Sequence, residues 1–511
     1  MSFPPDSKTS PGLTRSDGAR LSKSKFLSGL QCLKRLYLEV HSPELATEPD
    51  EHQQAILDMG TEVGELARRR FAGGVLVTAD YRHPAEALRR TAELLADPQV
   101  PAIFEAAIEF ERILVRVDIL ARMSESTNAA GRWRLIEVKS SAKVKPAHLN
   151  DLAVQAYVLR GAGILLERAS LLHIDTQYVH EGYELDVERL FALEDLTDTV
   201  MQRLPDVQAR VAEMKTILAG SMPAIEPGPH CQTPYECPFW QHCTKDKPTR
   251  WIYYLPGGDR TIQSLVKLGV QTIDDIPANF QLTVLQRRVK EGAEWIGPQL
   301  KALLERVQYP VHHVDFETYM TAIPRYAQTR PYQVIPTQWS NHIETQDGHI
   351  RHEEYLCCDP IDPRLTFIQT LLDSVGPEGS ICVYSPYERA VLEGLATAFP
   401  RFERDLRLVI GRLWDLLPVI REQYYHPAFQ GSFSIKSVLP AVVPNLTYDE
   451  LEIQEGGMAA QAYVRMVFDE TDWVEKLRLR EALLRYCAHD TRALFEVRRA
   501  LLHMARATSS G

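Results

Sequence analysis

The sequence lacks any apolar run long enough to cross a membrane, and the stretch from Met1 to Lys25 lacks the apolar core of a signal peptide. We therefore expect a cytoplasmic protein with no membrane partner. The chain also lacks the GxxxxGK(S/T) pattern of phosphate-binding loops, so no nucleotide cofactor and no ATP hydrolysis of its own are expected. Internal repeats are absent as well.

Basic residues are fewer than acidic ones: the chain has 57 Lys and Arg and 68 Asp and Glu, which gives a formal net charge of −11. This balance argues against a protein that coats nucleic acid nonspecifically. It does not exclude a nucleic-acid enzyme, because metal-binding carboxylates raise the negative count and bound cations offset it. The 45% apolar and 24% charged residues are typical of a globular protein. A chain of 511 residues is too long to fold around a single hydrophobic core, so about two or three domains are expected. Residues 1–20, rich in Ser, Pro and Gly, are predicted to be disordered.

Cysteine is also rare, with eight in the chain, and in the cytosol thiols bind metals more often than they form disulfides. Cys231, Cys237 and Cys243 are evenly spaced along a Pro-rich segment. Three interpretations remain open: ligands of an iron–sulfur cluster, ligands of zinc together with His230 and His242, or three unrelated buried thiols. The spacing is wider than the two to about four residues typical of zinc knuckles, which favours the cluster.

The stretch Leu135–Lys139 alternates apolar and charged residues, which predicts a β-strand with Glu137 and Lys139 on one face. A second strand is predicted over 113–120, and Asp118 lies within it. The polar segment between the two strands, from Ser124 to Gly131, predicts a hairpin loop.

Pairing of these strands brings Asp118 beside Glu137 and Lys139. Two carboxylates can hold Mg²⁺ or Mn²⁺, and a lysine beside the metal can orient an attacking water or stabilise charge on a phosphate. The pattern therefore indicates a phosphodiesterase site. The alternative interpretation is a surface hairpin with one salt bridge.

Two flanking features add to this site. An apolar run with helical spacing, 151–159, follows the strand and contains Gln155 and Tyr157, and basic residues surround Cys32 upstream, within 21–35. Together these features resemble the PD-(D/E)xK nucleases of the RecB type. The similarity is greatest to the iron–sulfur branch with the CRISPR-associated RecB-like exonucleases and the AddB nuclease domain. The resemblance covers roughly residues 21–245.

The resemblance implies Asp118 and Glu137 as metal ligands and Lys139 and Gln155 as catalytic residues. The family's Gln-x-x-x-Tyr appears here as Gln-Ala-Tyr, which makes Tyr157 an additional candidate. A further departure is that the predicted helix over 59–65 carries no His where many relatives have a metal-binding one.

The iron–sulfur relatives take one cluster ligand from the start of the domain and three from its end. By this resemblance, a [4Fe–4S] cluster is held by Cys32, Cys231, Cys237 and Cys243, and it acts as a structural clamp. Zinc remains the alternative metal.

Residues 246–305 predict a connector, with a short helix over Thr261–Val270 that ends at Gly269. The pattern up to Pro277 resembles a small helix-hairpin-helix unit that contacts a DNA backbone. A plain helical linker is the alternative. Basic clusters elsewhere have two interpretations, a solvated face or contacts to a nucleic-acid backbone; their residues are Lys23, Lys25, Lys34, Arg35, Lys139, Lys143 and Lys145.

A second constellation begins with a predicted strand over 311–318, which puts Asp315 and Glu317 on one face. Residues 483–494 predict a helix on which Tyr486 and Asp490 lie one turn apart and share a face. Between these two segments, a strand around 381–384 breaks into a helix that carries Glu388.

This ordered set resembles the DnaQ-like 3′–5′ exonucleases, the DEDD group of the ribonuclease H-like fold, over roughly 306–504. The resemblance implies two-metal hydrolysis, in which Tyr486 holds the attacking water. It also implies four carboxylate ligands: Asp315, Glu317, Glu388 and Asp490. The family has Asp where Glu388 stands, and Asp415 is a rival or additional acid. The aromatic segments 424–436 and 329–336 have two interpretations each, bases stacked in a single strand or packed loops.

The predicted fold class is therefore α/β, with a RecB-like PD-(D/E)xK core followed by a ribonuclease H-like mixed-sheet domain. This combination resembles an uncharacterised bacterial family of two-nuclease proteins. The leading hypothesis is a metal-dependent nuclease acting on single-stranded DNA ends in DNA repair or defence. The alternatives are an RNA 3′–5′ exonuclease, or a nucleic-acid-binding scaffold with degenerate sites that works with a helicase partner.

Overall fold

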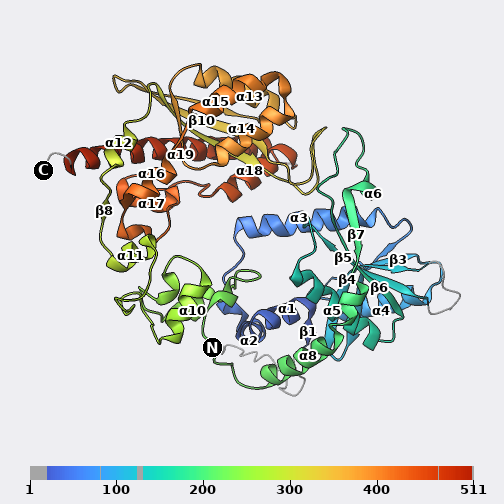
Figure 1. Ribbon diagram of the computed structural model, residues 1–511. Helices are drawn as coiled ribbons and strands as arrows, with labels where there is room; N and C mark the ends of the chain where they lie inside the picture. The colour runs from blue at the N-terminus through green and yellow to red at the C-terminus, as the bar shows by residue number, and fades with distance from the viewer. Residues whose placement is uncertain (1–19, 81, 124–130, 470, 509–511) are drawn as a thin grey trace, which may run out of the picture. The chain divides into compact units, whose positions relative to one another are not determined.

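The computed structural model describes residues 20–80, 82–123, 131–469 and 471–508. The described chain is mixed α/β, as predicted, and Figure 1 shows helices packed around its sheets. Its contacts divide it into two compact units. The N-terminal unit comprises Met1–Pro49, Leu57–Tyr178 and Glu184–Asp246, and the C-terminal unit comprises Asp50–Ile56, Val179–Tyr183 and Lys247–Gly511.

One mixed sheet forms the centre of the N-terminal unit, in the order β2-β3-β4-β5-β6-β7, and β1 pairs with β4. Neighbours β3, β4 and β5 are antiparallel, and β6 runs parallel to β5. The strands are β1 Leu21–Ser22, β2 Val75–Leu76, β3 Ala102–Phe110, β4 Ile113–Arg122, β5 Trp133–Lys139, β6 Leu166–Ile174 and β7 Phe191–Asp195. The two predicted strands are confirmed as β4 and β5. Most of the predicted hairpin loop, residues 124–130, lies outside the described residues, as do residues 1–19 of the predicted disordered segment.

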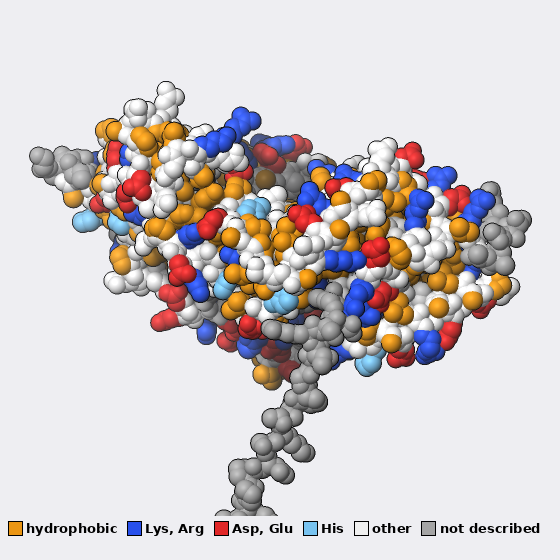
Figure 2. All heavy atoms as spheres, turned by 90° about the horizontal axis from the view of Figure 1, so that it is seen from below, with side chains coloured by type: hydrophobic (Ala, Val, Ile, Leu, Met, Phe, Trp, Pro, Cys, Tyr) orange, Lys and Arg blue, Asp and Glu red, His pale blue; other side chains and the backbone are white. Residues whose placement is uncertain are grey.

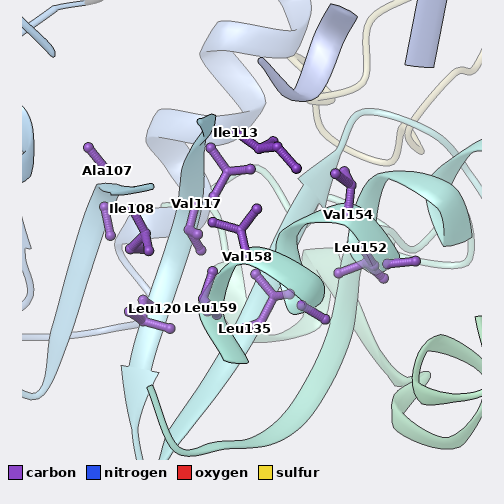
Figure 3. Close-up of a cluster of buried hydrophobic side chains, with 14 of the residues drawn as sticks. Ala107, Ile108, Ile113, Val117, Leu120, Leu135, Leu152, Val154, Val158 and Leu159 are labelled. Atoms are coloured by element: carbon purple, nitrogen blue, oxygen red, sulfur yellow. The ribbon is translucent and has the colours of Figure 1, made fainter. Parts of the chain in front are cut away.

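Helix α5, Pro146–Gly161, is the central helix of this unit and confirms the prediction over 151–159. It is apolar on most of its circumference because it contacts the sheet as well as α1 and α8. Figure 3 shows Val158 and Leu159 of α5 beside Val117 and Leu135 of the sheet. The helices of the unit are α1 Lys23–Gln31, α2 Leu33–His41, α3 Glu51–Arg68 from Leu57 onward, α4 Pro84–Ala96, α5, α6 Val187–Leu190, α7 Thr197–Met201, α8 Leu204–Ala219 and α9 Trp240–Thr244.

A second mixed sheet forms the centre of the C-terminal unit, in the order β11-β10-β9-β12-β13. Strand β10 is antiparallel to both of its neighbours, β11 and β9, whereas β12 pairs in parallel with β9 and with β13. The strands are β9 Val311–Tyr319, β10 Ile335–Glu344, β11 Ile350–Leu356, β12 Ser380–Val383 and β13 Leu413–Asp415; a separate ribbon pairs β8 Trp295–Ile296 with β14 Tyr424–Tyr425.

Helices cover this second sheet, and a long C-terminal helix, α19, contacts β9, β10 and β11. The core between β9, β10 and the helices α13, α14 and α15 contains Val314, Phe316 and Trp339. The helices of the unit are α10 Asp259–Lys267, α11 Val284–Glu291, α12 Leu300–Leu304, α13 Arg364–Val375, α14 Tyr387–Ala398, α15 Glu403–Arg412, α16 Leu416–Gln423, α17 Ile435–Val442, α18 Gly456–Phe468 and α19 Trp473–Thr508.

The connector residues 247–305 belong to the C-terminal unit. Helix α10 confirms the short helix predicted there, and the chain leaves it through Gly269, whose φ of 79° favours glycine. Residues 268–283 contain turns and no helix, so the closely spaced second helix expected of a helix-hairpin-helix unit does not follow α10 directly.

Within the described ranges, no helix is long and apolar enough to cross a membrane. On the face shown in Figure 2, Lys and Arg side chains lie among Asp and Glu side chains. Charge of one sign therefore does not dominate that face.

Candidate functional site

The first carboxylate cluster lies on the paired strands β4 and β5. Ile119 is opposite Ile136 in this antiparallel pair, so Asp118 lies beside Glu137 in the adjoining position. The carboxylate of Asp118 accepts a hydrogen bond of 2.7 Å from the backbone N–H of Val138. Burial and the charge of Glu137 raise the pKa of Asp118 to about 7.

Glu137 is the most enclosed acid of this cluster, with a relative exposure of 1%. Lys139 Nζ donates to Glu137 Oε1 at 2.7 Å, and Gln155 Nε2 donates to Oε2 at 2.6 Å. Burial raises the pKa of Glu137, but the charges of Lys23 and Lys139 outweigh it and hold this pKa below its ordinary range. The structure thus brings the predicted residues Asp118, Glu137, Lys139 and Gln155 together.

Two further residues of the cluster were not assigned from the sequence. Asp151, one turn before Gln155 on α5, accepts a hydrogen bond of 2.6 Å from Lys139. Lys23, at the start of α1, donates to Glu137 at 2.9 Å and lies 3.4 Å from Asp151. Helical spacing alone links Asp151 to Gln155, whereas no local pattern links Lys23 to a strand so distant in the chain.

The donor set of the cluster fits a hard divalent cation. Asp118 and Glu137 offer carboxylate oxygens, and the buried Oε1 of Gln155 has no hydrogen-bond partner among the described residues. Lys23 belongs to a basic cluster interpreted as a solvated face or a nucleic-acid contact, but its ammonium pairs with Glu137 instead. Tyr157 is not part of the site, because its ring packs against Phe110 with centroids 5.6 Å apart.

The four predicted cysteine ligands meet at one small cavity of the N-terminal unit, lined by Cys32, Cys231, Cys237 and Cys243. Cys32 lies between α1 and α2, Cys231 ends a short 3₁₀ helix, and Cys243 is on α9. All four are free thiols. Burial raises the pKa of Cys231 and Cys243, and it raises that of Cys237 to about 11.

The second carboxylate cluster lies on the face of β9 opposite its apolar core. Since Val314 and Phe316 face α13 and its neighbours, the alternate residues Asp315 and Glu317 face the other way. Burial and the charge of Asp490, on α19, raise the pKa of both carboxyls well above their ordinary range.

Glu388 and Asp490 complete this set, with relative exposures of 4% and 8%. Burial and nearby charges, among them that of Asp415, raise the pKa of Glu388 to about 7, and burial raises that of Asp490 to about 6. A hydrogen bond of 2.6 Å between Thr318 and Tyr387 ties β9 to the start of α14. The charges of Glu388 and Asp490 raise the pKa of Asp315 and Glu317, a repulsion that a bound cation would relieve.

Three other side chains surround Asp490. The hydroxyl of Tyr448 donates to its carboxylate. Tyr486 lies one turn earlier on α19, as predicted, with its ring 6.4 Å from that of Tyr448. Lys436 lies 5.5 Å from the Tyr448 ring and 5.7 Å from the Tyr486 ring, and its charge lowers the pKa of Asp490 and of Glu317. Sequence reasoning missed Tyr448, which no motif marks.

Cys487 is a further group that the sequence motifs did not assign. Ligand atoms of Asp315, Glu317 and Cys487 lie within 4.8 Å of one another, a group that can hold a metal ion. The thiol is fully buried, and its sulfur lies 3.9 Å from Oδ2 of Asp315. The sequence feature that could have identified Cys487 as a site residue is its position between Tyr486 and Asp490 on one helix.

Asp415 has a different role from Glu388. It caps α16 and accepts a hydrogen bond of 2.9 Å from the backbone N–H of Leu417. Oε2 of Glu388 is buried and has no hydrogen-bond partner among the described residues. The geometry therefore favours Glu388 over Asp415 as the free carboxylate of the cluster.

The aromatic side chains of segment 424–436 form a packed loop. Tyr424, Tyr425 and Phe429 are almost fully buried, and Phe429 contacts both tyrosine rings. The base-stacking interpretation is therefore wrong for these three residues. Lys436 is the member of the segment that reaches the second cluster.

A family model described as "Domain of unknown function (DUF2779)" matches residues 312–434. The matched stretch contains Asp315, Glu317 and Glu388 and ends before α19. No curated protein matches the chain.

Proposed function

We propose that the protein is a metal-dependent nuclease that hydrolyses single-stranded DNA ends, and that its C-terminal unit is a ribonuclease H-like 3′–5′ exonuclease domain. The observation that carries the proposal is the convergence of four acids, Asp315, Glu317, Glu388 and Asp490, whose pKa values are all raised. The mixed five-stranded sheet with these acids on β9, α14 and α19 supports it.

The chemistry of the C-terminal site follows from its residues. Mg²⁺ or Mn²⁺ held by the carboxylates would supply an activated water and stabilise the leaving 3′ oxygen. Tyr486 orients the water, and the hydrogen bond from Tyr448 fixes the carboxylate of Asp490. Lys436 carries the positive charge that offsets the charge of the scissile phosphate.

The N-terminal unit supports a second nuclease site of the RecB type. Asp118 and Glu137 are its metal ligands, Gln155 holds Glu137 in place, and Lys139 faces the phosphate. One observation favours the scaffold alternative for this unit: Lys23 and Lys139 together already neutralise Glu137. In that case a helicase partner would supply the activity.

The four cysteines are the proposed ligands of a [4Fe–4S] cluster, with zinc as the alternative metal. Their common cavity supports a shared metal site. A cluster there would join the start and the end of the N-terminal unit.

The function is tested with end-labelled single-stranded DNA and RNA in Mg²⁺ or Mn²⁺. We expect DNA to be degraded, Asp315→Ala to abolish trimming from the 3′ end, and Lys139→Ala to abolish the remaining cleavage. Glu393→Gln is the control, because Glu393 is exposed on α14 and lies outside both clusters. Faster cleavage of RNA would favour the RNA exonuclease. Binding without any cleavage would contradict the nuclease and favour the scaffold.

A further inference from the structure

A pocket of about 960 Å³ lies in the C-terminal unit. Four segments line it: α11, residues 384–385 after β12, α16, and residues 431–435, the last of which begins α17. Apolar side chains in the lining include Leu285, Leu417 and Phe433. This volume falls within the range of about 300–1,000 Å³ of ligand pockets.

Two arginines, Arg288 and Arg421, also line the pocket. Arg288 is held in place, because its guanidinium stacks on Trp295, 3.5 Å from the ring centroid, and donates to the backbone oxygen of Arg421 at 3.4 Å. Arg421 is exposed, as is Glu422, the one acid that lines the pocket. Guanidinium groups pair with phosphates in a fork geometry, and apolar side chains in the lining suit contact with a base.

Two of the bounding segments continue directly into the second carboxylate cluster. Ser385 lines the pocket and accepts a hydrogen bond of 3.0 Å from the backbone N–H of Tyr387, at the start of the helix that carries Glu388. Ile435 lines the pocket too, and the next residue, Lys436, lies 5.7 Å from the Tyr486 ring. A single-stranded nucleic acid that places a phosphate at the carboxylates would therefore have a neighbouring nucleotide close to this pocket.

We propose that the pocket binds a nucleotide of the single strand next to the cleaved bond, an inference that rests on the proposed nuclease function. The base lies on Leu285, Leu417 and Phe433, and the phosphate lies between Arg288 and Arg421. Helix α11 of the connector thus forms part of the substrate site of the C-terminal unit.

Binding of a short fluorescein-labelled oligothymidine to the full chain in EDTA tests the pocket without turnover. Arg421→Glu is expected to weaken binding about tenfold or more and to reduce the salt dependence by one phosphate contact. Arg404→Glu, an equally exposed charge reversal on α15 outside the pocket, is expected to bind like wild type. Arg421→Gln, which removes the charge without reversing it, should give an intermediate affinity.

Equal affinities of Arg421→Glu and Arg404→Glu would overturn the pocket assignment. Matching melting temperatures of the two variants exclude a folding defect as the cause of weaker binding. The proposed function is tested apart from the pocket, by hydrolysis of bis-p-nitrophenyl phosphate by wild type and Asp490→Asn in Mn²⁺. A wild type that hydrolyses nothing, combined with weak binding by Arg421→Glu, overturns the nuclease and supports the strand-binding pocket.

Discussion

Two ammonium groups share one buried carboxylate in the N-terminal cluster, because Lys23 and Lys139 both donate to Glu137. Lys23 therefore opposes a divalent ion at the same acid. In EDTA, Lys23→Met should lower the free energy of unfolding by about 3 kcal/mol, since one partner of a buried ion pair is lost. Saturating Mn²⁺ should reduce the difference in unfolding free energy between Lys23→Met and wild type. Lys23→Met should also bind Mn²⁺ more tightly than wild type does.

Urea denaturation with and without Mn²⁺, together with calorimetric titration of Mn²⁺, measures both effects of Lys23→Met. Lys143→Met is the control, because Lys143 is exposed and lies outside the cluster. A Mn²⁺ affinity equal to that of wild type would show that Lys23 does not oppose the cation.

Glu388 should make stability depend on pH. Its pKa of about 7 in the folded protein exceeds the value of about 4.3 in an unfolded chain. Between these values the folded state keeps a proton that the unfolded state has released. The free energy of unfolding therefore falls as pH rises through this window, by up to about 1.4 kcal/mol per pH unit.

Glu388→Gln, neutral in both states, should flatten this fall in urea denaturation followed in EDTA from about pH 4.3 to about pH 7. Glu393→Gln, an exposed change on the same helix, should leave the fall of the unfolding free energy with pH unchanged. The same slope in both variants would contradict the buried, proton-binding state of Glu388.

At the scale of elements, α19 is joined to the sheet by a buried polar network. Thr491, next to Asp490, lies at hydrogen-bond distance, 2.8 Å, from Ser340 and from His342 on β10. Thr491→Val should cost about 1–3 kcal/mol of unfolding free energy, because both partners remain buried. Thr491→Ser keeps the hydroxyl and should cost less. Chemical denaturation of both variants measures the difference, and an equal loss in the two variants would contradict a dominant role of the hydroxyl.

The elements that carry the acids were predictable because their periodicity is plain. Alternation marked β4, β5 and β9, and helical spacing marked α5 and α19. Strand β10 was not predicted, because polar residues such as Gln338 and Asn341 interrupt its apolar pattern. They are buried because the strand lies between β11 and β9 and α19 packs on it, and Gln338 donates to a backbone oxygen of α19 at 2.9 Å.

Within the sites, the sequence predicted the residues that belong to a spaced motif and missed those that arrive from elsewhere. Asp315, Glu317 and Asp490 follow strand and helix spacing. Lys23 and Tyr448 reach their partners only through tertiary packing, which spacing does not encode. The sequence also did not decide whether Tyr424 and Tyr425 are buried or stack on bases, because an aromatic segment suits both a core and a stacking surface. The structure buries both side chains.

At the scale of the whole molecule, the proposed metal sites are distributed unevenly between the two units. The N-terminal unit contains one carboxylate cluster and the four cysteines, which line a cavity between α1, α2 and the segment that ends in α9, whereas the C-terminal unit contains the second carboxylate cluster. The proposed iron–sulfur cluster would constrain the start and the end of the N-terminal unit alone. Loss of the cluster should therefore destabilise one unit selectively.

Protein purified without oxygen should contain about four irons and four sulfides per chain. Cys237→Ala should lose them, and hydrogen exchange should then speed up in α1, α2 and α9 but remain unchanged in β9 and α19. Cys358→Ala is the matched control, since Cys358 is exposed and lies in the C-terminal unit. Colourless protein with one zinc per chain would contradict the cluster. Faster exchange throughout both units would contradict its confinement to the N-terminal unit.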